Sequence, residues 1–144
     1  MNAMIETYRG AVYPWHCDHM GHMNVMWYVG KFDEATWNLF AQLGVTAAFL
    51  RDNARAMAAV QQNITYKHEL LSGDVVAVRS GMLESRDKVV KFVHEMRDAQ
   101  TGEVSAVCVL TVVHMDGKAR KSIAFPSAVA ARAKALLCDY KLER

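Results

Sequence analysis

The residues of this chain that could carry out chemistry are concentrated in one short stretch, residues 13–28 (YPWHCDHMGHMNVMWY). Asp18 lies in this stretch among large apolar side chains such as Trp15 and Met23. A carboxylate in such surroundings must find hydrogen-bond donors, because its charged form is otherwise destabilised. We therefore treat Asp18 as the candidate nucleophile or general base of the chain.

The residues after Asp18 predict a helix that begins close to that carboxylate. Asn24 is a suitable N-cap, and the first backbone N–H groups of a helix, here from about Val25, have no partner inside the helix. They also carry the positive end of the helix dipole. Gly21 allows the loop to turn back, so that the carboxylate and these N–H groups converge. A carboxylate beside an oxyanion-stabilising helix terminus is an arrangement that acyl transfer needs.

The elements that must position this stretch follow from the periodicity of the apolar residues. From Val25 to Leu43 they recur at intervals of three and four, which predicts one long buried helix that ends at Gly44. After residue 55 the period changes to two, and short turn sequences separate antiparallel neighbours. Strands are predicted at residues 4–13, 57–68, 74–84, 88–97, 103–115 and 119–124, and a terminal helix at 126–138. This order predicts an α+β domain in which one helix packs against a curled sheet.

Length and composition describe one domain over residues 1–144. Of these residues 52% are apolar or aromatic and 22% are charged, which excludes a disordered chain. A net charge of +2 does not favour nucleic-acid binding, and no run approaches the ~18 apolar residues of a membrane span. No signal peptide is recognisable, and three widely spaced cysteines indicate reduced thiols, so we expect a cytoplasmic protein.

The pattern D-x-x-G-H-x-N at residues 18–24, followed by Tyr28 and a long helix, resembles the acyl-CoA thioesterases of the 4-hydroxybenzoyl-CoA thioesterase type. The resemblance covers the whole chain in the order of its elements, with a weaker match at residues 63–76. It implies the hot-dog fold, an α+β fold in which a curved antiparallel sheet wraps one long helix and a short C-terminal helix follows.

The resemblance implies an enzyme that hydrolyses an acyl-CoA to the free acid and CoA. Asp18 would attack the thioester carbonyl or activate water, while the backbone N–H of Val25 polarises the carbonyl oxygen. A second N–H, near Ala56, would come from the other subunit of a homodimer, and such dimers often pair into homotetramers. No metal or organic cofactor is implied, since coenzyme A is part of the substrate. The resemblance makes His22 and Asn24 motif positions that would either contact substrate or only hold the loop, and Gly21 is the glycine of the same motif.

Aromatic side chains are dense around Asp18, and all three tryptophans lie between residues 15 and 37. One interpretation is core and dimer interface, which we favour for Trp37. The other is an acyl pocket suited to an aryl group or to a quaternary ammonium held by cation–π contacts. The stretch is similar to the thioesterases of carnitine breakdown, which implies betainyl-CoA as the substrate. The residues predicted to bind the acyl group are Tyr13, Trp15, Trp27 and Tyr28.

Three alternatives stay open. A non-catalytic hot-dog module would bind an acyl-CoA or another small ligand without turnover. His16, His19 and His22 could instead serve a metal-dependent hydrolase, although no second ligand pair follows them. Cys17 could be a nucleophile, although a small thiol more often packs. Basic residues that could meet the CoA phosphates, or form a solvated face, are Lys88, Lys91, Arg120 and Lys121.

Overall fold

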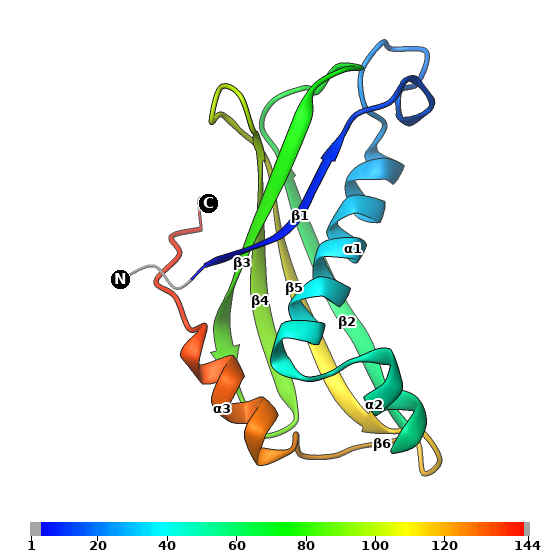
Figure 1. The fold of residues 1–144 in the computed structure, drawn as a ribbon, viewed down its shortest axis with the longest axis vertical. Helices are drawn as coiled ribbons and strands as arrows, with labels where there is room; N and C mark the ends of the chain where they lie inside the picture. Colours follow the sequence, from blue (N-terminus) through cyan, green and yellow to red (C-terminus); the bar gives the residue numbers. More distant parts are fainter. Residues whose placement is uncertain (1–3, 143–144) are drawn as a thin grey trace.

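An antiparallel sheet curves around one long helix in the computed structural model, which describes residues 4–142 (Figure 1). The strand order is β1-β3-β4-β5-β2, and the short strand β6 pairs with β5. The strand β2 therefore forms one edge of the main sheet and β1 forms the other. The strands are β1 (Ile5–Ala11), β2 (Arg55–Tyr66), β3 (Val75–Ser85), β4 (Val89–Asp98), β5 (Val104–Asp116) and β6 (Lys121–Ser122).

The long helix α1 (Val25–Leu43) is held at both ends by the residues expected from the sequence. Asn24 caps its beginning, because the side-chain oxygen accepts the Met26 N–H at 2.9 Å. Gly44 ends the helix with a φ of 94°, a left-handed conformation that favours glycine. The buried face of α1 consists of Tyr28, Lys31, Phe32, Ala35, Thr36, Leu39, Phe40 and Leu43. This packing sets the position of the loop that precedes the helix.

A chain of hydrogen bonds crosses the core and joins β1, β3 and β4 to α1. Its centre is His94, which has no exposed surface. The Thr36 hydroxyl donates to the Phe32 carbonyl at 3.0 Å, so it accepts from His94 Nε2 at 2.8 Å. The Ser80 hydroxyl donates to His94 Nδ1 at 2.5 Å, and it forms a second hydrogen bond with the Thr7 hydroxyl at 2.7 Å. Burial lowers the pKa of His94 to about 3, so the ring is neutral at neutral pH.

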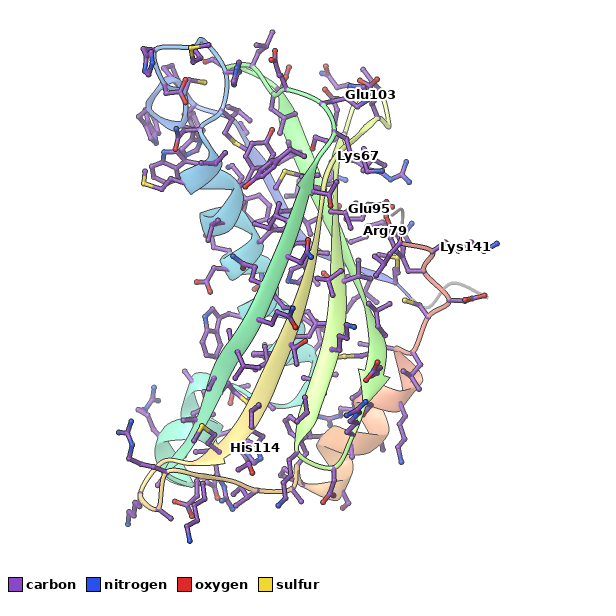
Figure 2. All side chains as sticks on the ribbon, turned by 180° about the vertical axis from the view of Figure 1, so that it is seen from behind. Lys67, Arg79, Glu95, Glu103, His114 and Lys141 are labelled. Carbon is purple, nitrogen blue, oxygen red and sulfur yellow. The ribbon has the colours of Figure 1, made fainter. Side chains whose placement is uncertain are left out.

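The residues after α3 pack on the face of the sheet that points away from α1. Helix α3 (Ser127–Ala135) itself packs against α1 and β3 and adds Val129 and Ala133 to the main core, whereas Cys138 and Tyr140, which follow it, join a small apolar cluster on the face away from α1. Figure 2 shows Glu95 on the same face, where its carboxylate accepts the Tyr140 hydroxyl at 2.6 Å. Burial opposes ionisation of Glu95, but hydrogen bonds from Arg97 and Tyr140 outweigh it and lower the pKa.

The structure confirms the predicted α+β hot-dog architecture. Helix α1 has the predicted bounds, and the five long strands lie within about two residues of their expected positions. The predicted strand at 119–124 contains only two strand residues, and the terminal helix predicted at 126–138 ends at Ala135. Helix α2 (Ala47–Asp52) and the 3-10 turn Pro14–His16 were not expected, because such short elements contain too few residues to reveal a period.

Candidate active site

The loop before α1 folds into a tight hairpin that carries Asp18. Cys17 and Met23 face each other in an isolated antiparallel bridge. Between them the Asp18 N–H donates to the His22 carbonyl at 3.2 Å, and the Gly21 N–H donates to the Asp18 carbonyl at 3.0 Å. Gly21 has a φ of 85°, which confirms that a glycine lets the chain turn back here.

The Asp18 carboxylate is held by two N–H donors. Oδ2 accepts from Asn24 Nδ2 at 2.7 Å, and Oδ1 accepts from the Met20 N–H at 2.8 Å. The hydrogen bond from Asn24, followed by that from Met20, lowers the pKa of Asp18. The carboxylate is therefore ionised at neutral pH and is oriented by its neighbours.

One side chain, that of Asn24, connects this carboxylate to the start of α1. Its amide nitrogen bonds Asp18 while its amide oxygen caps the Met26 N–H, and its backbone carbonyl accepts the Trp27 N–H at 3.0 Å. Among the described residues, the Val25 N–H has no hydrogen-bond partner. The Val25 side chain is exposed. An open N–H donor thus lies at the helix terminus that Asn24 ties to the carboxylate.

Aromatic rings stack at the base of this loop. The rings of Tyr13 and Trp15 are parallel within 2° and their centroids are 4.5 Å apart. They remain 49% and 65% exposed, so one indole face is open to solvent or to a ligand. The partly buried Trp27 packs against the His16 ring at 4.4 Å. Three of the four residues predicted to bind the acyl group thus lie in one cluster.

The fourth of these residues, Tyr28, belongs to the core. It is 4% exposed, its hydroxyl donates to the His68 carbonyl at 3.3 Å, and burial raises its pKa to about 12. Its ring meets Tyr66 of β2 edge-on at 5.1 Å. A groove of about 270 Å³ opens at this point and is also lined by Val25 and His22. Tyr28 therefore contributes one wall of a groove beside the helix terminus.

Ala56 does not lie near Asp18 of its own chain. Ala56 is at the beginning of β2, whereas Tyr66, at the other end of β2, contacts the first turns of α1. Figure 1 shows that β2 begins beside α2, at the opposite end of the molecule from the loop before α1. Ala56 could therefore take part only in the site of a second copy, as the family resemblance implies.

The three histidines of the loop have different surroundings. His16 is buried and its Nδ1 accepts the Tyr13 N–H at 3.0 Å, while His19 is exposed. His22 Nε2 lies 3.5 Å from Glu69 Oε1. Within residues 4–142, no three His, Cys, Asp or Glu side chains are grouped so that they could hold a metal ion.

The basic residues considered for the CoA phosphates are spread over other parts of the chain. Lys88 immediately precedes β4, and Arg120 and Lys121 follow β5, near the end of the sheet where α2 lies (Figure 1). Lys91 lines a separate hollow of about 190 Å³ with residues of β2 and β5. These residues lie away from the loop of the same chain. No helix in the described part of the chain is long and apolar enough to cross a membrane.

Lys31 supports the loop in a way that the sequence did not reveal. It lies on the buried face of α1 and is 3% exposed. Its ammonium donates to the Tyr8 hydroxyl at 2.8 Å and to the Ala11 carbonyl at 3.3 Å. The available signal was its position three residues after Tyr28, within the apolar stripe of the helix. Lys31 ties α1 to the end of β1, from which the loop departs.

Comparison with known proteins assigns the chain to a family. The model of the thioesterase-like superfamily matches residues 12–133. Betainyl-CoA thioesterase of Pseudomonas aeruginosa is 25% identical over 136 residues, which cover 94% of this chain and 86% of that protein. L-carnitine dehydrogenase/betainyl-CoA thioesterase of Rhizobium meliloti is 28% identical over 117 residues, or 81% of this chain. The match covers 23% of that longer relative, so the chain corresponds to about a quarter of it.

Solved structures share the fold at low sequence identity. A Staphylococcus aureus protein in complex with CoA superposes with a TM-score of 0.89 at 17% identity, and the match covers 99% of this chain and 92% of that one. A 1,4-dihydroxy-2-naphthoyl-CoA thioesterase from Synechocystis gives a TM-score of 0.81 at 15% identity, with coverages of 91% and 96%.

Proposed function

Because the chain belongs to the thioesterase-like superfamily, we propose that it hydrolyses an acyl-CoA to the free acid and CoA, with Asp18 as the catalytic carboxylate. The family confirms the thioesterase resemblance that the loop motif indicated. The observation that supports the role of Asp18 is its ionised carboxylate, tied by Asn24 to a helix terminus with an open N–H at Val25. A carboxylate and an oxyanion donor side by side are what thioester hydrolysis requires.

The reaction uses these groups in one of two ways. The thioester oxygen accepts the Val25 N–H, which stabilises the negative charge that develops on it. In the first route an Asp18 oxygen attacks the carbonyl carbon, CoA leaves as the thiolate, and water hydrolyses the resulting anhydride. In the second, Asp18 removes a proton from water as the water attacks. Both routes release the free acid and CoA.

A second copy of the chain completes the site in this proposal. The edge strand β2 is twelve residues long, and after Arg55 it contains neither a charged residue nor proline, the features that usually protect an edge. Antiparallel pairing of two β2 strands about their middle brings Ala56 of one copy opposite Thr65 of the other, next to Tyr66. Tyr66 contacts Tyr28, so Ala56 of the partner would approach the start of α1.

The acyl group that we propose is small and carries a quaternary ammonium, as in betainyl-CoA. Two relatives carry betainyl-CoA thioesterase in their names, and the open indole face of Trp15 offers the aromatic surface that such cations bind. The Asp18 carboxylate adds a negative charge nearby. The neutral isostere 3,3-dimethylbutyryl-CoA has the same shape without the charge, so it isolates the contribution of the cation.

A thiol-release assay tests the activity and the role of Asp18. The wild-type protein is assayed with short, aromatic, long-chain and betainyl-CoA substrates, and Asp18→Asn is compared with His19→Asn, an exposed residue of the same loop. We expect Asp18→Asn to lower kcat/KM by about 10²–10⁴ and His19→Asn to change it little. If the wild type hydrolyses none of the substrates, the alternative of a non-catalytic binding module holds. Full activity in Asp18→Asn would refute the role of this carboxylate.

Two further measurements test the substrate and the dimer. A ratio of kcat/KM for betainyl-CoA over 3,3-dimethylbutyryl-CoA near one would refute selection of the cation. Sedimentation velocity measures the oligomeric state, which we expect to be a dimer or a tetramer. Val60→Asp, in the middle of β2, should dissociate it, whereas Ala99→Asp in the β4–β5 turn should not. A monomeric and fully active wild type would contradict a site shared between two copies.

A further inference from the structure

We propose that His16 is a positioning residue of the catalytic loop, and that its neutral ring holds Asn24 and Asp18 in place so that protonation of His16 switches the enzyme off. This inference rests on the proposed thioesterase activity. Among the described residues, the hydrogen-bond partners of the Asp18 carboxylate are Met20 and Asn24, so His16 acts on it through the backbone.

The geometry connects the His16 ring to the site in three steps. His16 ends the 3-10 turn Pro14–His16, and its Nδ1 accepts the Tyr13 backbone N–H at 3.0 Å, which closes this turn. The carbonyl of the same residue accepts the Asn24 N–H at 2.9 Å. Asn24 in turn holds the Asp18 carboxylate at 2.7 Å and caps α1. A change in the turn is therefore passed directly to the residue that orients Asp18.

The bond to Tyr13 requires an unprotonated Nδ1. Nδ1 accepts a hydrogen bond from the Tyr13 N–H. If Nδ1 were protonated, two N–H donors would face each other and the bond would be lost. His16 is 8% exposed, and the centroid of its ring lies 4.4 Å from the ring centroid of Trp27 and 5.7 Å from that of Trp15. A protonated ring would thus lose a hydrogen bond in a place where little water can replace it.

The charges around His16 favour the neutral ring. Burial lowers the pKa of His16, and the ammonium of Lys31 on α1 lowers it further, while Glu34 on α1 raises it in part. A third titratable group, Tyr13, directly precedes the turn, and its ring contacts the His16 ring. Hydrogen bonds lower the pKa of Asp18 as well, and the ordinary pKa of an aspartate is already below that of a histidine. The acid side of the pH profile therefore follows His16, and activity is lost as the pH falls through the His16 pKa.

The first experiment compares pH profiles of kcat/KM between pH 4 and 8. His16→Asn places a side-chain oxygen near the position of Nδ1, so it keeps an acceptor for the Tyr13 N–H but cannot be protonated in this range. We expect wild-type activity to fall about tenfold per pH unit below the His16 pKa, and His16→Asn to extend activity to lower pH. His16→Leu, which lacks the acceptor, should be impaired at every pH. The control His19→Asn should keep the wild-type profile.

The second experiment does not depend on turnover. Heteronuclear NMR follows the His16 ring and the Asn24 side-chain amide of the wild type in one pH titration, with circular dichroism to confirm that the protein stays folded. We expect the Asn24 amide to shift with the pKa of His16, which lies below 6.5. The inference is overturned if the chemical shift of the Asn24 amide does not change as His16 titrates. It is also overturned if kcat/KM decreases at low pH in the same way in His16→Asn and in the wild type. Absence of hydrolysis with a coupled Asn24 amide would refute only the proposed function.

Discussion

The buried ring of His94 makes the free energy of unfolding of this protein depend on pH. A variant without this ring therefore measures how much of that pH dependence comes from His94. The unfolded chain takes up a proton on this histidine near pH 6.5, whereas the native ring resists protonation until about pH 3. The native state is therefore destabilised progressively as the pH falls from 6.5 towards 3. At pH 4.5, two pH units below the unfolded value, the loss is about 3 kcal/mol. That is a large share of the roughly 5–15 kcal/mol by which domains are stable.

The perturbation is His94→Gln, which has no titrating ring. At pH 7 this variant should be about 1–3 kcal/mol less stable than the wild type, because Ser80 and Thr36 lose well-placed partners. Between pH 7 and 4.5, however, it should lose about 3 kcal/mol less than the wild type does. Other acid-sensitive groups contribute equally to both proteins and cancel in this difference.

Urea unfolding followed by circular dichroism at pH 7 and at pH 4.5 provides the four free energies. His68→Gln serves as a control, because it removes a histidine from the exposed surface and leaves the buried network intact. If His94→Gln and the wild type lose the same free energy between the two pH values, the neutral ring is not the source of acid sensitivity. The reasoning about the buried network would then be wrong.

Three other substitutions test the supports of the site and of α1. Asn24→Ser keeps an N-cap oxygen but removes the amide donor to Asp18. The pKa of Asp18, measured by ¹³C NMR titration, should therefore rise towards 3.8, and kcat/KM should fall. An unchanged pKa would contradict the role of the amide. Lys31→Met removes a buried cation, and NMR should find a higher pKa for His16; no increase would mean that Lys31 does not act on it. Gly44→Ala should lower the free energy of unfolding in urea by about 1–2 kcal/mol, because the φ of residue 44 is 94°. The value of kcat/KM should stay unchanged, because Gly44 and the site lie at opposite ends of α1.

The parts of the fold that the sequence predicted correctly are those specified by neighbouring residues. Helix α1 begins and ends as expected because Asn24 and Gly44 are local signals for a cap and a stop. The long strands were located because short turn sequences separate them. The hairpin of the loop was also anticipated, since Gly21 is the one residue there that adopts a left-handed conformation at little cost.

The features that the sequence did not reveal depend on contacts between distant segments. His94 is an ordinary position of a strand until Thr36, Ser80 and Thr7 are brought around it from three other elements. His16 was considered as a metal ligand because of its spacing from the other histidines, and its bond to the Tyr13 N–H depends on a 3-10 turn too short to be recognised. The N–H donor near Ala56 would act in the site of a second copy of the chain. The sequence alone therefore indicated it only through the family resemblance.

The strand order also determines when each strand can pair while the chain is being synthesised on the ribosome. The first strand, β1, pairs with β3, and β2 pairs with β5, so each waits for a partner that is translated much later. Until those strands are translated, α1 lacks most of the sheet that it packs against, and the uncharged part of β2 has no strand to pair with. Such late, long-range pairing slows folding and exposes a nascent chain to aggregation. Stalled chains that end at Asp98, before β5, should therefore be protease-sensitive and bind chaperones, while chains that include β5 become protected.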